Sequence, residues 1–348
     1  MIGKAILVTP ELTHTGAPNS TMYMACALQK IGYYPIIYTM VQGGLDREID
    51  KRGIPIKQFC TPNDFCHENF GENDICFVNT SMLAECAIVL QKMLPTILII
   101  REGKCILEFH KIFGTNWEKI LEVKNVYCVS EYASQELFKI IGVKPKVIRN
   151  YTPDVFQSNQ FQKDNILRFG IIGTFEKRKG VDICLDAFLE ISKNRKDVEL
   201  HIVGRTLDWE KEFWKPQIER INNHANIIYH GEITSREEMN SIYKLLNVVI
   251  VASLDESCSL VALEAASMRK YLIISRNVGA KYLVTKFNGK LFDTGNALDL
   301  QKAMESAIKN RKLINFGGYI SRWMYLRKGS ESNYLKNIKK EIKSMKSI

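Results

Sequence analysis

The chain has 348 residues, of which 46% are hydrophobic and 25% charged; this is typical of a globular protein and long enough for two domains of similar size. The formal net charge is +10, but the basic excess is concentrated from Arg322 onward. A nucleic-acid-binding protein would carry basic residues interleaved with aromatic residues along a groove, so that function is disfavoured.

The cysteine pattern and the hydrophobic runs indicate where the protein works. The nine cysteines are scattered singly, which favours a reducing cytoplasm. Cys60, Cys66 and His67 lack a second pair of ligands, so we predict no metal site there. No signal peptide or membrane span is predicted. We therefore expect a cytoplasmic protein, with peripheral attachment to the inner face of the cell membrane as an option.

The first half of the chain alternates predicted strands and helices, which indicates a parallel α/β domain. The predicted strands are Lys4–Thr9, Tyr34–Met40, Ile75–Asn79, Thr96–Arg101 and Val126–Ser130. A loop over residues 10–18 precedes a helix predicted over residues 19–31, and Gly16 in this loop allows a ligand to approach the backbone. The loop lacks G-x-G-x-x-G, which argues against a dinucleotide oxidoreductase.

Ligands of open α/β sheets bind outside the carboxyl ends of the strands. In the first half these positions hold Asn79, Thr80, Arg101, Glu102, Ser130 and Glu131. Arg101 has two interpretations of equal weight: it binds a phosphate or carboxylate of a second substrate, or it is a salt-bridged structural arginine.

A polar linker over residues 152–164 separates this half from a second α/β half. Phe169–Gly173 is a predicted strand, followed by the turn Gly173–Gly180, which reads GTFEKRKG, and an amphipathic helix. Glu199–Gly204 and Asn226–Gly231 are further predicted strands. Ser235 and Glu238 predict a capping box for the helix that follows.

The stretch 247–277 carries the strongest signal in the chain. A buried strand, Val248–Val251, leads through a polar turn into a helix over Leu260–Met268, capped by Ser257 or Ser259, and then into the strand Tyr271–Ser275. The unpaired N–H groups and the positive end of that helix form an anion site.

Two carboxylates, Glu256 and Glu264, flank this anion site. They would repel a phosphate and are better suited to accept hydrogen bonds from hydroxyl groups. A ligand with both phosphates and hydroxyls is a sugar nucleotide.

Two motifs together carry a resemblance to a known family. Glu256–Ala265, ESCSLVALEA, resembles the E-x7-E signature of retaining glycosyltransferases with the GT-B fold, particularly glycosyltransferase family 4. The turn Gly173–Gly180 is similar to the family's Gly-Arg-Leu-x-x-x-Lys-Gly. Lys179 lies at the position of the phosphate-binding lysine, whereas Thr174 replaces the arginine, whose contact is lost or taken over by Arg178. The resemblance is specific from Phe169 to about Phe292.

The resemblance implies a fold and a set of roles. The fold would be α/β with two Rossmann-like domains facing across a cleft. Glu256 would orient the transferred sugar, Glu264 would hold the ribose, and Lys179 with the amides of residues 258–261 would stabilise the diphosphate. The donor-binding residues would be Gly16, Thr174, Arg178, Lys179, Gly204, Arg205, Ile233, Glu256, Ser257, Cys258, Ser259, Leu260, Val261 and Glu264, with Glu256 and Lys179 also catalytic.

The acceptor side is less defined. The expected residues are Asn79, Arg101, Glu102 and Ser130. The family places a histidine near the position of Arg101 and Glu102, and this chain has none there, which leaves the acceptor chemistry open.

We expect a retaining, hexosyltransferase-type enzyme that transfers a sugar from a nucleoside diphosphate sugar to an acceptor hydroxyl. The expected acceptor is a glycan or a lipid-linked acceptor in bacterial-type polysaccharide, glycolipid or glycoconjugate synthesis. No metal ion or other cofactor is expected, because lysine and backbone amides neutralise the diphosphate. A GT-B sugar-nucleotide epimerase is the alternative within enzymes, and a basic nucleic-acid-binding protein the alternative outside them.

The predicted domains are residues 1–153, joined by C-terminal helices from about 319 to 348, and residues 154–318. Within the tail, Tyr334, Ile338, Ile342 and Met345 recur at helical spacing. We expect this stripe to pack on the first domain while the lysines of the helix face outward and adsorb to an anionic membrane. These lysines are Lys336, Lys339, Lys340, Lys343 and Lys346.

Overall fold

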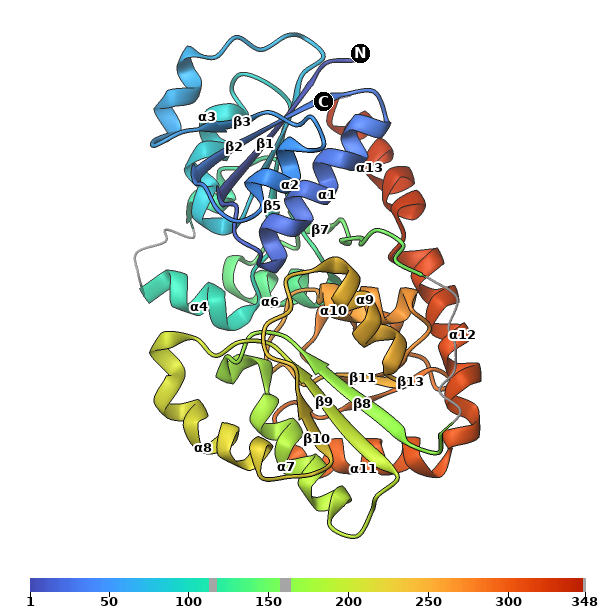
Figure 1. Cartoon of the computed structure of the whole chain (residues 1–348). Helices are drawn as coiled ribbons and strands as arrows, with labels where there is room; N and C mark the ends of the chain where they lie inside the picture. The colour runs from blue at the N-terminus through green and yellow to red at the C-terminus, as the bar shows by residue number, and fades with distance from the viewer. Residues whose placement is uncertain (113–117, 157–163, 347–348) are drawn as a thin grey trace. The chain divides into compact units, whose positions relative to one another are not determined.

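A computed structural model describes residues 1–112, 118–156 and 164–346. The chain folds into two compact units, residues 1–153 with 328–348, and residues 154–327 (Figure 1). The first boundary lies where the sequence placed it. The second lies at residue 328 and not at 319, because helix α12 (Arg311–Lys328) packs on the second unit along most of its length.

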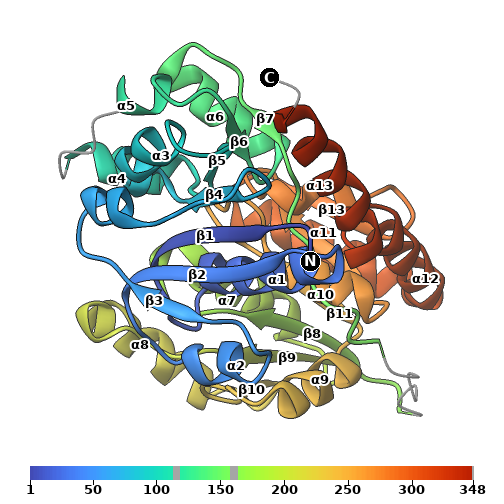
Figure 2. The same ribbon diagram turned by 90° about the horizontal axis from the view of Figure 1, so that it is seen from above.

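The first unit is built on a parallel sheet. Its strands run in the order β3-β2-β1-β4-β5-β6-β7, which Figure 2 shows from above. Their bounds are β1 Lys4–Glu11, β2 Tyr34–Val41, β3 Ile56–Gln58, β4 Ile75–Asn79, β5 Thr96–Ile100, β6 Val126–Cys128 and β7 Lys146–Val147. Strands β4 and β5 are buried at every position because helices cover both faces of the sheet. The order reverses between β1 and β4, as in a doubly wound fold.

The helices of the first unit are α1 Gly16–Lys30, α2 Asp46–Asp50, α3 Ala84–Leu90, α4 Lys104–Ile112, α5 Glu118–Leu121, α6 Glu131–Ile141 and α13 Glu331–Lys346. Helix α1 begins at Gly16, so the predicted loop over residues 10–18 is shorter than expected. No side chain caps this helix and no acid lies in its first turn. Its start is therefore set by packing on β1 and β2 and not by a local cap.

Helix α13 confirms the predicted amphipathic tail. Its apolar stripe, Tyr334, Ile338, Ile342 and Met345, is buried, and the helix packs on α1. Tyr127 donates a hydrogen bond to Glu341 at 2.6 Å. The five lysines that the sequence singled out are all exposed.

The second unit repeats the same strand order. Its parallel sheet runs β10-β9-β8-β11-β12-β13. The bounds are β8 Leu167–Ile172, β9 Val198–Val203, β10 Ile227–Tyr229, β11 Val248–Val251, β12 Tyr271–Ser275 and β13 Gly289–Phe292. The order reverses between β8 and β11, which makes the carboxyl ends of these two strands the switch point of the sheet.

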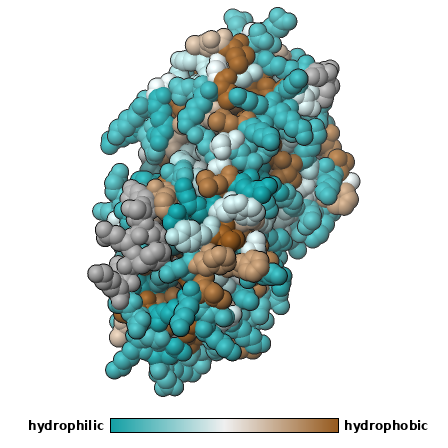
Figure 3. Space-filling view, turned by 90° about the vertical axis from the view of Figure 1, so that its right-hand side faces the viewer, coloured by the Kyte–Doolittle hydropathy of each residue, from teal (hydrophilic) through white to brown (hydrophobic). Residues whose placement is uncertain are grey.

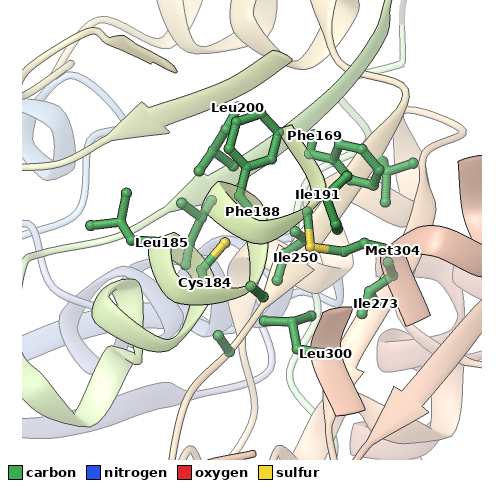
Figure 4. Packing of buried hydrophobic residues seen from close by; sticks show 14 of the residues in the cluster. Phe169, Cys184, Leu185, Phe188, Ile191, Leu200, Ile250, Ile273, Leu300 and Met304 are labelled. Carbon is green, nitrogen blue, oxygen red and sulfur yellow. The ribbon is translucent and has the colours of Figure 1, made fainter. Parts of the chain in front are cut away.

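The helices of the second unit are α7 Val181–Ser192, α8 Lys211–Asn222, α9 Arg236–Leu245, α10 Leu260–Ser267, α11 Ala297–Lys309 and α12 Arg311–Lys328. Helix α7 packs its apolar face on the sheet and on α11, and the resulting core joins Phe188 to Phe169, Ile250 and Met304 (Figure 4). This core fixes α7, and α7 begins at the switch point.

Helix α12 packs closely on the second unit because it carries two adjacent glycines. A Cβ added to Gly318 would lie 2.2 Å from the carbonyl oxygen of Arg269, and one added to Gly317 would lie 2.8 Å from that of Phe287. Asn288 donates a hydrogen bond to Ser321 in the same contact, at 3.0 Å. These contacts are the physical reason for the shifted boundary.

Candidate functional site

The loops that follow β8 and β11 meet at the switch point of the second sheet. The first loop contains the short 3-10 helix Lys177–Lys179, and the second contains Glu256. The backbone N–H of Leu254 donates to the carbonyl of Arg178 at 2.8 Å. Crevices at such a point are where open α/β sheets bind ligands.

Glycine is required at two positions in these loops. Gly180 has a φ of +66°, and an added Cβ would lie 2.3 Å from the carbonyl oxygen of Ala252. Gly204, after β9, has a φ of +151°, and an added Cβ would lie 1.9 Å from the carbonyl oxygen of Gly173. Only glycine permits both the backbone conformation and the close approach.

Helix α10 starts in the second loop and is capped by Ser259. The Ser259 hydroxyl accepts a hydrogen bond from the N–H of Ala262 at 3.3 Å, so of the two predicted serines Ser259 is the cap. Its φ of +91° is unusual for a residue with a side chain, and such strain is common at functional sites. No acid lies in the first turn, so the positive end of the helix is not neutralised from within that turn.

The other predicted residues of this turn differ in burial. Cys258 is buried, whereas Ser257, Leu260 and Val261 are half-buried. The backbone of the turn is held from the far side, because Ala280 donates its N–H to the carbonyl of Cys258 at 2.7 Å.

Glu256 and Lys179 are brought together by the two loops. The Lys179 Nζ donates to the Glu256 Oε2 at 3.1 Å, and the hydroxyl of Ser253 donates to the same oxygen at 2.7 Å. Burial alone would raise the pKa of Glu256, but the charge of Lys179, the bond from Ser253 and the charge of Arg178 together hold this pKa below its ordinary value. Glu256 is therefore ionised at neutral pH.

Arg178 has partners of its own within the loops. Its guanidinium donates to the carbonyl of Asp255 at 2.9 Å and to the carboxylate of Glu176 at 2.9 Å. Thr174, at the position of the family's arginine, is half-buried. With these bonds in place Arg178 fixes the second loop, and its expected contact with a phosphate stays a prediction.

Glu264 lies in α10 with its carboxylate held by α9. Arg236 donates to its Oε1 at 2.9 Å and the Tyr243 hydroxyl donates to its Oε2 at 2.9 Å. Tyr243 is fully buried. Neither residue was predicted from the sequence. The signal that could have found them is their spacing of seven residues, which places both on one face of an amphipathic helix.

Three of the predicted donor-binding residues, Gly204, Arg205 and Ile233, lie in the loops that follow β9 and β10. The Tyr229 hydroxyl donates to the carbonyl of Gly204 at 2.8 Å. Arg205 is exposed and lies 3.5 Å from the carboxylate of Glu232, and Ile233 is half-buried. These loops border the same end of the sheet as Glu256 and Lys179.

The predicted residues of the first unit form a separate, mostly buried cluster. Arg101 donates to the side-chain oxygens of Asn79 and Asn150, each at 2.7 Å. Glu102 accepts from the backbone and the hydroxyl of Ser81 at 2.7 and 3.0 Å, and Ser130 caps α6. These bonds of Arg101 are to amide oxygens and not to an acid, so both interpretations of Arg101, and an acceptor role for this cluster, stay predictions.

Gly16 borders open space at the start of α1. A Cβ added there would meet no atom within 4 Å, so packing does not require glycine at this position. Nothing in the unit itself therefore explains Gly16, and its predicted contact with a donor remains to be tested.

Taken together, the second unit combines a helix N-terminus, one lysine and two carboxylates at one end of a parallel sheet. The lysine and the helix end favour phosphate oxygens. The carboxylates accept hydrogen bonds from hydroxyl groups. This arrangement is suited to a ligand that contains both.

Comparisons of the sequence with known proteins match part of the chain. Residues 152–317 match the model of a family described as Glycosyl transferases group 1. The uncharacterized glycosyltransferase MJ1178 of Methanocaldococcus jannaschii is 27% identical over 212 residues, which are 59% of this chain and 54% of that protein. The match thus spans about half the length of this relative.

Solved structures agree in fold over nearly the whole chain. HepE of Anabaena in complex with UDP and glucose has a TM-score of 0.82 at 16% identity, covering 98% of this chain and 100% of that one. A glycosyltransferase from Rickettsia africae gives 0.79 at 18% identity, with coverage of 99% and 98%. Sucrose-phosphate synthase from Thermosynechococcus elongatus gives 0.78 at 13%, with 99% of each chain covered. The fold is therefore GT-B.

Proposed function

We propose that this protein is a retaining glycosyltransferase of family 4 type that transfers a sugar from a nucleoside diphosphate sugar to an acceptor hydroxyl. The observation that carries the proposal is the meeting of Lys179, Glu256 and the start of α10 at the switch point of the second sheet. HepE, which has a similar fold, is described in complexes with UDP and with UDP-glucose, so uridine nucleotides are the first donors to test.

The chemistry follows from the charges at this site. Cleavage of the glycosidic bond leaves a nucleoside diphosphate, whose developing negative charge must be stabilised. Lys179 and the N–H groups at the start of α10 would bind the diphosphate oxygens. Glu256, ionised and anchored by Ser253, would accept hydrogen bonds from the hydroxyls of the transferred sugar. Glu264, anchored by Arg236 and Tyr243, would accept bonds from the ribose.

We propose that transfer requires no divalent ion, because lysine and the helix end supply the positive charge that a metal would otherwise provide. Activity should therefore persist in saturating chelator. Loss of activity with chelator that magnesium or manganese restores would contradict this proposal.

The central test compares variants of the two loops. Lys179→Ala should lower transfer by roughly 100-fold, and Glu256→Gln should lower turnover. Glu264→Ala should weaken binding of UDP by roughly 1.5–3 kcal/mol because a charged acceptor is lost. Lys177→Ala is the matched control: it lies in the same turn and is exposed.

Calorimetric titration with UDP and detection of UDP release from a panel of UDP-sugars provide the readouts. Release that requires an acceptor identifies a transferase and excludes an epimerase, and the anomeric configuration of the product by NMR tests retention. Wild-type kinetics in folded Lys179→Ala and Glu264→Ala variants would overturn the site assignment.

We also propose that the acceptor is a glycan or a lipid-linked acceptor and that the enzyme adsorbs to anionic membranes through α13. The apolar stripe of α13 is covered within the first unit, while its five lysines are exposed. Each such lysine contributes about 1 kcal/mol near an anionic surface. Replacing the five lysines by glutamine should lower vesicle binding, and the loss should shrink as salt rises.

A further inference from the structure

Helix α12 exposes large apolar side chains on the side that faces away from its own unit. Their exposed fractions lie between 46% and 59%. They are Leu313, Phe316, Tyr319, Trp323 and Leu326. Steps of three, three, four and three residues place them along one side of the helix. The opposite side of the helix, with Ile314, Met324 and Tyr325, is buried. The exposed apolar stripe is therefore not part of the core.

The exposed stripe continues onto a neighbouring loop. Phe287 is 54% exposed, and the contact of its carbonyl with Gly317 places it against α12. We call Phe287 and the five side chains of the stripe the α12 face. Figure 3, turned toward the side of the molecule on which α12 lies in Figure 1, shows pale and brown side chains gathered near the middle among hydrophilic ones. Contiguous exposed apolar surface of this kind marks an interaction site.

The charged residues of helix α12 itself have one sign. Residues 311–328 contain no aspartate or glutamate, and their basic residues are Arg311, Lys312, Arg322, Arg327 and Lys328. Arg327 packs over the ring of Trp323, 4.8 Å from its centroid. Two acids outside the helix pair with it, Asp154 with Arg322 at 2.8 Å and Asp197 with Arg311 at 3.6 Å. Lys286 and Lys290 beside Phe287 are exposed. The partner should therefore be both apolar and anionic.

We propose that the α12 face docks on the headgroup region of an anionic lipid bilayer. Helices that lie in a membrane interface carry Trp, Phe and Leu on one face with Lys and Arg beside them, and Trp and Tyr favour the headgroup level. A second copy of this chain fits less well, because a symmetric α12 contact would bring basic helices together without an acid in either to pair with them. The proposal does not depend on the sugar-transfer activity.

The test uses the full-length chain and vesicles of phosphatidylglycerol and phosphatidylcholine. We expect Phe316→Ala with Trp323→Ala to lower the partition coefficient at least tenfold at 0.5 M salt, where the electrostatic contribution of α13 is largely screened. The matched control is Trp209→Ala with Leu298→Ala, which removes two exposed apolar side chains of the same unit, 80% and 58% exposed, outside the α12 face. This control should bind within twofold of wild type.

A second readout, fluorescence quenching, uses a substitution that keeps an aromatic ring. Lipids brominated near the headgroup should quench the fluorescence of Trp323, and the quenching should fall in Trp323→Phe, which keeps an apolar ring and therefore binds vesicles. UDP affinity, measured on each variant, should stay unchanged, so that a failure here is distinct from a failure of the proposed function.

Three outcomes would overturn the proposal. They are wild-type partitioning of the Phe316/Trp323 variant, unchanged quenching in Trp323→Phe, and wild-type protein that leaves vesicles unbound at 0.5 M salt. A dimer in solution that the Phe316/Trp323 variant loses, without vesicle binding, would assign the face to a second copy. Binding only to an added acidic protein would assign it to a protein partner.

Discussion

Glu256 retains its charge in a largely buried position because three neighbours outweigh the effect of burial on its pKa. A carboxyl whose folded-state pKa is lowered stabilises the fold above its ordinary pKa of about 4.3, and this contribution is lost as the pH falls through the folded-state pKa. We therefore expect Glu256→Gln to lower the melting temperature at pH 7, where Lys179 loses its anionic partner, at a cost of roughly 1–3 kcal/mol.

The difference from wild type should begin to shrink as the pH falls below about 4.3, because the unfolded wild-type chain then binds a proton at Glu256. It should be lost once the pH has also passed below the lowered folded-state pKa. Melting curves from pH 7 to pH 3 check this sign. A gap that widens toward low pH would show that the lowered pKa of Glu256 is wrong.

Tyr243 positions Glu264 through its hydroxyl, which donates a hydrogen bond to Oε2. Tyr243→Phe keeps the buried ring and removes the donor of this bond, so the fold should survive. We expect UDP affinity to fall about tenfold, since a hydrogen bond to a charged group contributes about 1.5 kcal/mol or more. In a Glu264→Ala background the same substitution should have little further effect. An equal loss in both backgrounds would mean that Tyr243 acts on the ligand by another route.

The site was predictable where its parts lie close in sequence or carry a motif. Ser259 follows Glu256 by three residues, and the Lys179 turn has a recognisable spacing. The bonds from Arg236 and Tyr243 to Glu264 span 28 and 21 residues, and they depend on where α9 packs beside α10. No local sequence pattern indicates how α9 packs beside α10, so the partners of Glu264 could not be predicted from the sequence.

At the scale of elements, the packing of α12 depends on glycine at position 318. Alanine at position 318 would favour the helix by about 1 kcal/mol on propensity alone, but its Cβ would lie 2.2 Å from the backbone of Arg269. We expect overpacking to dominate, with Gly318→Ala destabilising the second unit by roughly 1–3 kcal/mol. Asn315→Ala, on the exposed side of the same helix, should leave the melting temperature unchanged or slightly higher. A stabilised Gly318→Ala variant would show that α12 is loosely packed.

The same helix shows why element boundaries were harder to predict than element types. The buried strands β4 and β11 were predicted to the residue, because an uninterrupted apolar run can only be a central strand here. Strand β3, Ile56–Gln58, was missed: it is short, it lies at the sheet edge and two of its three residues are exposed. Gly317 and Gly318 weaken a helix locally. Their presence in α12 is explained only by the close contact of the helix with the rest of the second unit.

For the whole molecule, the two units have separate sheets and separate cores. We therefore expect two calorimetric transitions, with Gly318→Ala lowering the one that belongs to residues 154–327. UDP at one hundred times its dissociation constant should stabilise that same transition by about 2.7 kcal/mol, and Glu264→Ala should reduce the shift at equal UDP concentration. A UDP shift confined to the other transition would place the nucleotide in the first unit.

Within the residues that the structure describes, no helix has both the length and the apolar character needed to cross a bilayer.

The chain leaves the first unit after residue 153 and returns to it at residue 328, and the backbone N–H of Thr152 donates to the carbonyl of Gly329 at 3.4 Å. The two connections are thus neighbours, and the second unit is an insertion whose ends lie close together. If the protein is stretched between residues 4 and 346, force passes through the first unit alone until the segments around Thr152 and Gly329 separate. The second unit is thereby shielded from tension, and the proposed nucleotide site within it should keep its shape while the first unit begins to yield.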